Sequence, residues 1–387
     1  MTEILVVLAI SIAAFGAAGY LVRWLVGQPS GDAEMSRVAA LIQNGAESFA
    51  RRQTGIIGAL AALLGGVLFL AYGLRPATGD VVPGFELGVW LTLSFAVGAS
   101  SALVTSRTAT WVAGRGAVRA AAAAQKSVDA ALQASVRAGG AVSLWIGAAS
   151  ALTTSGLVLA LLVYHGALGE DPIPARALVP VAPWLVLGHA LGASFAALLM
   201  QLSGGSFSKA ADIGADVGAR EAGLDDDAAE NPATVADLAG DCVGGTGNRA
   251  AASFATAACE DLVMMLALAL VYAADTQLKN ALALVMLPLV VRALGQLGTA
   301  FATFIVRTDE REAPQAAVFR GLVVALVVHA FGLVGAVEWL LPARRGALVA
   351  CAAIGAALGI AVIALTNYFV GLRFRPARDA ADAARGG

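Results

Sequence analysis

Two groups of charged residues, separated by a short loop, stand out from a chain that is otherwise rich in alanine, leucine and glycine. Lys209, Asp212 and Asp216 follow at i, i+3 and i+7, a spacing that puts their side chains on one helix face. Asp237 and Asp241 follow at i and i+4, so they also share a face. Such oxygen ligands suit Mg²⁺, which favours carboxylates combined with substrate phosphates. The pattern predicts two helix ends that hold Mg²⁺ and a phosphate compound, with Lys209 on a phosphate oxygen.

The start of the second of these helices is marked in the sequence. Asn231 suits the N-cap and Pro232 suits the first turn. The alternative for the whole region is a solvated cytoplasmic loop whose acids cap helices. The run Asp225-Asp226-Asp227 favours that alternative, because runs of like charge are usually solvated.

A second set of charges lies deeper in the apolar segment that follows. Arg249 and Glu260 are eleven residues apart, about three helical turns, so they share a face, and Asp261 comes directly after Glu260. Charges at such depth in a membrane segment indicate function, and we predict an ion relay formed by Glu260 and Arg249. In the alternative, the acid pair lies near the outer end of the helix or pairs with Arg292 of the next segment.

The rest of the chain supplies the elements that must position these residues. Of the 387 residues, 59% are hydrophobic and 13% are charged, against roughly 25% charged in soluble domains. About 20 apolar residues span a bilayer. The sequence therefore predicts an all-α polytopic membrane protein with nine helices. They are expected at 3–27, 54–76, 86–111, 138–165, 177–205, 233–273, 281–306, 317–341 and 346–372.

Orientation follows from the basic residues. The segments after the first, third, fifth and seventh apolar runs, with the C-terminal tail, carry most of the Lys and Arg. Cytoplasmic loops are enriched in these residues, so the N-terminus is expected outside and the C-terminus in the cytoplasm. We expect one membrane domain (1–387), a cytoplasmic acidic loop at 204–241, helical extensions over 112–137 and a frayed tail at 373–387.

The acidic region also carries a family resemblance. GGSFSKAADIGAD (204–216) and ENPATVADLAGD (230–241) resemble motifs of the membrane-bound pyrophosphatases, ion pumps that hydrolyse inorganic pyrophosphate. Segments 34–53, 106–113, 287–308 and 355–369 resemble the same family. The resemblance covers roughly the N-terminal half of a family member, since members have about sixteen membrane helices and form homodimers.

The resemblance implies roles for particular residues. It assigns Mg²⁺-pyrophosphate binding to Lys209, Asp212, Asp216, Asp237 and Asp241, and it places Asp226 near a family glutamate. Other positions depart from the family pattern. The next aspartate of the family's sixth helix is Gly245 here, and the ion-gate positions read Gln201, Ala252 and Cys259.

Two functions follow as hypotheses for an integral protein of the bacterial inner membrane. In the first, the chain binds Mg²⁺-pyrophosphate and contributes to hydrolysis coupled to H⁺ transport, with a partner that supplies the missing half. In the second, it is a catalytically inactive structural or regulatory subunit of a membrane complex. Both predict contact with lipid and a homo- or hetero-oligomer, and neither involves nucleic acid. An unrelated secondary transporter is a third class, and it would have to produce the motifs by chance.

Overall fold

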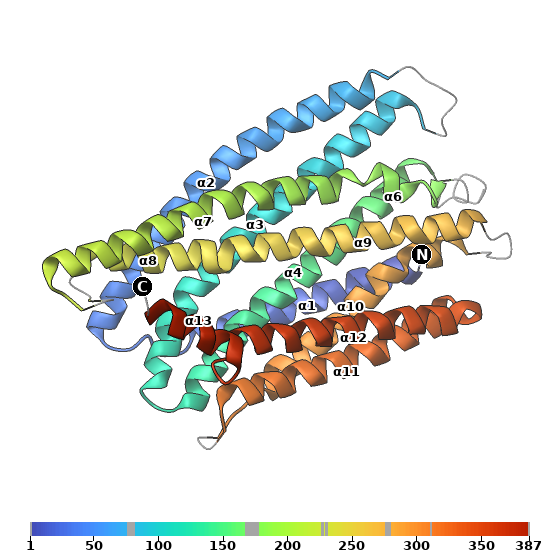
Figure 1. Ribbon diagram of the computed structural model, residues 1–387. Coiled ribbons are helices and arrows are strands. Elements are labelled where there is room, and N and C mark those ends of the chain that lie inside the picture. The colour runs from blue at the N-terminus through green and yellow to red at the C-terminus, as the bar shows by residue number, and fades with distance from the viewer. Residues whose placement is uncertain are drawn as a thin grey trace. The chain divides into compact units, whose positions relative to one another are not determined.

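The computed structural model describes residues 2–75, 82–166, 178–225, 228, 231–274, 280–309 and 312–385. Every regular element in these ranges is helical (Figure 1). The elements are α1 (Thr2–Val26), α2 (Ala33–Gly73), α3 (Gly84–Ala124), α4 (Val128–Tyr164), α6 (Ala182–Leu185), α7 (Gly188–Ala222), α8 (Pro232–Gly240), η1 (Asp241–Gly247), α9 (Asn248–Ala274), α10 (Ala281–Ile305), α11 (Pro314–Leu340), η2 (Pro342–Arg344), α12 (Arg345–Val370) and α13 (Arg375–Arg385).

Nine helices in the described part of the chain are long and apolar enough to cross a membrane. The predicted all-α polytopic membrane protein is therefore confirmed. Membrane-embedded helices contact lipid, so lipid is a partner of this chain. The orientation of the two termini stays a prediction.

Several helices run well past the apolar segments that the sequence predicts. Helix α2 begins at Ala33, α3 continues to Ala124 and α7 continues to Ala222. The added turns are rich in alanine, the best helix former, and contain no proline. A helix of 41 residues, such as α2, is about 60 Å long at 1.5 Å per residue, whereas the hydrocarbon core is about 30 Å thick. These helices therefore reach far beyond the membrane.

The chain divides into two compact units, Met1–Gly332 and Leu333–Gly387. In the second unit, the segment expected as a frayed tail forms helix α13, in which Arg385 pairs with Asp382 one turn earlier. Arginine and alanine dominate α13, and both favour helix. The single membrane domain stays a prediction.

The core of the first unit forms where α3 meets α2, α4, α7 and α9. Its large buried side chains are Phe95 of α3, Met200 of α7 and Phe254 of α9. Glycines allow α3 and α7 to touch through their backbones. A Cβ added to Gly192 would lie 2.0 Å from the carbonyl oxygen of Phe95, and one added to Gly98 would lie 1.9 Å from that of His189. Small residues at a helix interface permit such close approach in membranes, and this contact fixes the position of α7.

Candidate functional site

Helix α7 carries the first group of predicted site residues. The region 204–241, expected to be a loop, is mostly helical, because α7 continues to Ala222 and α8 begins at Pro232. Gly223 ends α7 in the left-handed conformation (φ +66°), which glycine adopts without steric cost. Lys209, Asp212 and Asp216 thus lie on a continuous helix. Asp226 lies outside the described residues.

Lys209 and Asp212 form an ion pair on α7. The Lys209 Nζ lies 2.6 Å from Asp212 Oδ2, and the two side chains are 78% and 40% exposed. Asp237 of α8 and Asp216 of α7 also act electrostatically on Lys209. The structure therefore brings charges from both helices together around one lysine. Because the ammonium is exposed, it is available to an incoming phosphate, and carboxylates from both helices lie in the same region.

Asn231 ties the start of α8 to α7. Its Oδ1 accepts a hydrogen bond from the Ala233 N–H (3.0 Å), which caps α8 as the sequence predicts, and its Nδ2 donates to the carbonyl oxygen of Ala215 (2.8 Å). Asn231 is only 5% exposed, so this contact is shielded from water. The same residue therefore begins α8 and holds it beside the turn that carries Asp212 and Asp216.

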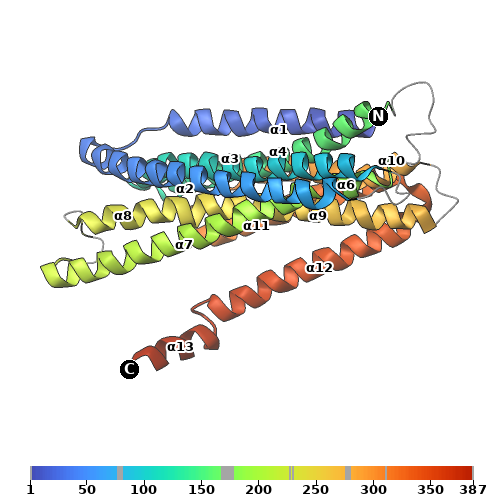
Figure 2. The same ribbon diagram turned by 90° about the horizontal axis from the view of Figure 1, so that it is seen from above.

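Farther along, α7 meets α8 and η1 at glycines. A Cβ added to Gly240 would lie 2.9 Å from the Cα of Ser208, and one added to Gly244 would lie 3.0 Å from the carbonyl oxygen of Gly204. Figures 1 and 2 show α7 and the α8–α9 segment side by side along much of their length. This approach sets Asp237 and Asp241 next to the Lys209 turn.

A π-helical segment, η1 (Asp241–Gly247), joins α8 to α9. Such segments insert one extra residue per turn and often occur at functional sites. Asn248, fully buried, closes the segment: its Nδ2 donates to the carbonyl oxygen of Met200 (2.8 Å) and its Oδ1 accepts from Ser106 Oγ (3.2 Å). Asp241 is exposed at the start of η1, and Gly245 one turn later faces open space, with only Asp241 within 4 Å of an added Cβ.

The carboxylates do not form a ready-made metal cage. Within the described ranges, no three His, Cys, Asp or Glu side chains gather closely enough to hold a metal ion. The set instead resembles the way Mg²⁺ binds with substrate, through one or two carboxylates plus phosphate oxygens and water. Asp212 and Asp237 are half-buried, whereas Asp216 and Asp241 are exposed. The donor set fits Mg²⁺ brought by a phosphate compound and does not fit a metal bound by protein alone.

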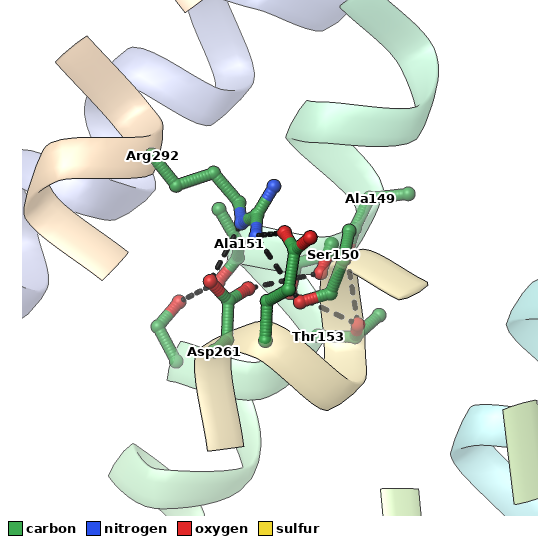
Figure 3. A network of polar contacts seen from close by, with 9 residues as sticks. Ala149, Ser150, Ala151, Thr153, Asp261 and Arg292 are labelled. Carbon is green, nitrogen blue, oxygen red and sulfur yellow. Dashed lines mark hydrogen bonds and ion pairs between the residues drawn. The ribbon is translucent and has the colours of Figure 1, made fainter. Parts of the chain in front are cut away.

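The second set of charges forms a network between α4, α9 and α10 (Figure 3). Arg292 of α10 donates from Nε to Asp261 Oδ1 (2.6 Å) and from Nη2 to Glu260 Oε2 (3.0 Å). Ser150 Oγ of α4 donates to Asp261 Oδ2 (3.1 Å). Asp261 and Ser150 are buried, whereas the Glu260 side chain is 61% exposed. One guanidinium thus bridges both carboxylates.

This arrangement bears on the predicted relay. Glu260 and Asp261 pair with Arg292, which is one of the alternatives that the sequence leaves open. Arg249 does not contact Glu260, because about three helical turns separate the two residues. Sequence reasoning missed Ser150, because one serine in a small-residue helix carries no distinguishing signal. The ion relay of Glu260 and Arg249 stays a prediction.

A family model described as inorganic H⁺ pyrophosphatase matches residues 12–387. The chain belongs to this family. Among its relatives is a K⁺-insensitive pyrophosphate-energized proton pump of Caldanaerobacter subterraneus, 32% identical over 95% of this chain and 51% of the relative. The pyrophosphate-energized membrane proton pump 3 of Arabidopsis thaliana is 30% identical over 98% of this chain and 49% of the relative.

Membership in the pyrophosphatase family agrees with the predicted resemblance and with an integral membrane location. A putative K⁺-stimulated pyrophosphate-energized sodium pump of Bacteroides thetaiotaomicron is also 30% identical, over 97% of this chain. The relatives therefore include proteins named for either ion. The chain spans about half the length of these pyrophosphatases.

Proposed function

We propose that this chain binds Mg²⁺-pyrophosphate at the α7–α8 face and contributes to its hydrolysis, coupled to H⁺ transport, together with a second polypeptide that supplies the rest of the site. The observation that carries the proposal is the exposed Lys209, paired with Asp212 and under the influence of Asp237 from the facing helix. Family membership supports pyrophosphate as the phosphate compound.

The residues of this chain would divide the work of binding. Asp212, Asp216, Asp237 and Asp241 would hold Mg²⁺, with Asp226 as a further candidate, and Mg²⁺ would offset the negative charge of pyrophosphate. Lys209 would exchange its contact with Asp212 for a phosphate oxygen, which keeps the ammonium charge paired. Asn231 would hold the two helix ends at a fixed separation through its bond to Ala215.

The hydrolysis itself requires more than these groups. A water oxygen bonds to one phosphorus, the bond from that phosphorus to the bridging oxygen breaks, and the bridging oxygen leaves with the second phosphate. A base must take the proton of the attacking water. Gly245 stands where the resemblance leads one to expect a further aspartate, so the second polypeptide would supply the base and the opposite wall. Glu260 and Arg249 are the candidates of this chain for the ion relay.

The alternative is a structural or regulatory subunit without catalytic activity. The residues at the ion-gate positions, Gln201, Ala252 and Cys259, favour it, because none carries a charge. In this case, the α7–α8 face would bind Mg²⁺ with pyrophosphate or a related phosphate compound without turnover.

Binding and turnover are tested separately. Calorimetry of the purified chain with Mg²⁺ and a non-hydrolysable pyrophosphate analogue is expected to show binding that is lost in Lys209→Met and Asp212→Asn and retained in Asp379→Asn, a matched change on α13. Phosphate release from pyrophosphate is then measured in membranes of the source organism and is expected to fall in Asp241→Ala. Binding that survives both α7 changes would refute the site. Binding without release from any membrane preparation would support the inactive subunit.

A further inference from the structure

An apolar groove of about 540 Å³ lies between α1, α3 and α4. Helix α4 packs against both α1 and α3 and forms the floor of the groove, which includes Trp145. Phe15, Gly19 and Val22 of α1 form one wall, and Trp111 of α3 contributes to the other. A Cβ added to Gly19 would meet no atom within 4 Å. The described part of the chain therefore leaves room here for an apolar ligand.

The groove extends along α1 for about half the thickness of a membrane. It reaches from Val22 to Phe15, and α1 ends at Val26, close to Trp24. Tryptophan is enriched where a membrane meets water, so this end of α1 marks the interface. Phe15 precedes Val26 by eleven residues, about 16 Å along the helix. Half of the hydrocarbon core is about 15 Å thick. The groove therefore has the length of an acyl chain in a single leaflet.

Arg119 of α3 lies at the interfacial end of this groove. It donates from Nη2 to the carbonyl oxygen of Val26 (3.0 Å) and from Nη1 to that of Arg115 (2.9 Å). Both acceptors are neutral, and the Nε of Arg119 is buried without a hydrogen-bond partner among the described residues. The charge that acts on Arg119 is that of Arg115, a second cation. Within the described ranges, no carboxylate forms an ion pair with Arg119.

Arg115 connects the arginines to the groove wall. Its guanidinium lies over Trp111, with 4.1 Å from Cζ to the ring centroid, and its Nη1 binds Glu47 at 2.8 Å. Arg119 follows Arg115 by one turn, so both stand near the interfacial end of the groove. Guanidinium groups bind phosphate through paired N–H donors, and basic pockets between membrane helices bind anionic lipid headgroups. An apolar groove that ends at two arginines therefore matches the chemistry of an anionic phospholipid.

Other occupants match the groove less well. A helix is about 10–12 Å across, so 15 Å of helix occupies more than about 1,000 Å³, which exceeds the volume of the groove. A free phosphate ion would pair with Arg119 and leave the apolar walls uncovered. A phospholipid covers the walls with its acyl chain and brings a phosphate to the arginines.

We propose that an anionic phospholipid binds in the groove between α1, α3 and α4, with an acyl chain beside Gly19 and Trp145 and its phosphate at Arg119. Arg115 makes a second contact with the phosphate and keeps its place over Trp111. The lipid fills the space between α1 and α3 and brings an anion to Arg119. This binding site shares no residue with the α7–α8 face, and it goes beyond the proposed function.

Native mass spectrometry of the purified chain tests this site. The protein is released from detergent micelles that contain phosphatidylglycerol or phosphatidylcholine, and the bound lipids are counted. We expect one phosphatidylglycerol to stay bound. Arg119→Gln should lower its affinity at least about tenfold, because a charge-assisted contact to the phosphate is lost, whereas Arg119→Lys keeps a cation and should lose less. Gly19→Leu should also lower the affinity, because the added side chain would fill the groove.

Two variants of α2 supply matched controls. Arg51→Gln removes an exposed arginine, and Gly66→Leu enlarges an exposed glycine whose added Cβ would meet nothing within 4 Å. Both should keep the lipid. A second readout leaves the site unchanged. Phosphatidylglycerol brominated on its acyl chains should quench tryptophan fluorescence more than brominated phosphatidylcholine at equal concentration, because Trp111 and Trp145 line the groove.

Four results would overturn the inference. They are equal retention and equal quenching by the two lipids, equal loss of phosphatidylglycerol in Arg119→Gln and Arg51→Gln, full retention in Gly19→Leu, and displacement of the lipid by inorganic phosphate. The last result would indicate a site for free phosphate. Asp212→Asn, which should abolish analogue binding, is expected to leave phosphatidylglycerol bound. Loss of the lipid site and loss of the proposed pyrophosphate site are therefore separate outcomes.

Discussion

The ion-pair network of Asp261 gives the sharpest energetic prediction. Arg292→Gln removes the guanidinium that donates to Asp261 at 2.6 Å and to Glu260 at 3.0 Å. Asp261 is 2% exposed, so its carboxylate would stay buried, with Ser150 as the remaining donor among the described residues. Breaking a buried pair by removing one partner costs about 3–5 kcal/mol. We expect Arg292→Gln to lower the free energy of unfolding by about that amount.

The exposed pair Arg37–Glu34 on α2 supplies the control. Its side chains are 64% and 66% exposed, and exposed pairs contribute little to stability because water screens both charges. Arg37→Gln should therefore leave the free energy of unfolding nearly unchanged. Titration of the protein in mixed micelles with a denaturing detergent, followed by far-ultraviolet circular dichroism, measures both variants under one condition.

The double variant Arg292→Gln with Asp261→Asn separates loss of packing from an unpaired charge. Replacing both partners with neutral amides removes the buried charge and leaves groups that can hydrogen-bond each other. Most of the lost stability should return, so the two single changes should not add. Two results would contradict this reasoning. One is a loss of stability in Arg292→Gln no larger than that in Arg37→Gln. The other is a double variant whose loss of stability equals the sum of the two single losses, because Arg292 would then not stabilise the protein by compensating the buried charge of Asp261.

Two further predictions concern glycines. Gly245→Asp should tighten Mg²⁺ binding by about tenfold in calorimetry, because the added carboxylate would stand beside Asp241. Gly245→Ala adds no carboxylate and should leave the Mg²⁺ affinity unchanged. Equal affinities of the two variants would show that position 245 faces away from the metal. Gly192→Ala should lower the free energy of unfolding by about 1–3 kcal/mol in the same detergent titration, because the added methyl group would clash at the α3–α7 contact. In the control, Gly139→Ala, the added Cβ would have no neighbour within 4 Å and should cause no such loss. Equal stability of the two variants would contradict the backbone contact.

The sequence by itself determined the elements and the chemistry they carry. Nine apolar segments predicted nine spanning helices because the length and polarity of a span are set locally by the bilayer. Helical spacing predicted that Lys209, Asp212 and Asp216 share one helix face and that Asp237 and Asp241 share another. The sequence also predicted Asn231 as the N-cap of the second helix. All of these follow from helix geometry within one segment.

Only the tertiary structure decided which of these faces meet and which charges pair. Arg292 binds Glu260 and Asp261, and Ser150 joins them, because α4 and α10 pack beside α9; nothing within α9 specifies that contact. Asn231 reaches back to Ala215, and glycines allow α7 and α8 to approach closely. The π-helical turn at Asp241 lies where η1 packs against α7, a contact between separate segments. A contact between two helices depends on the shape and burial of both helices. The residue pattern of one helix therefore cannot predict it.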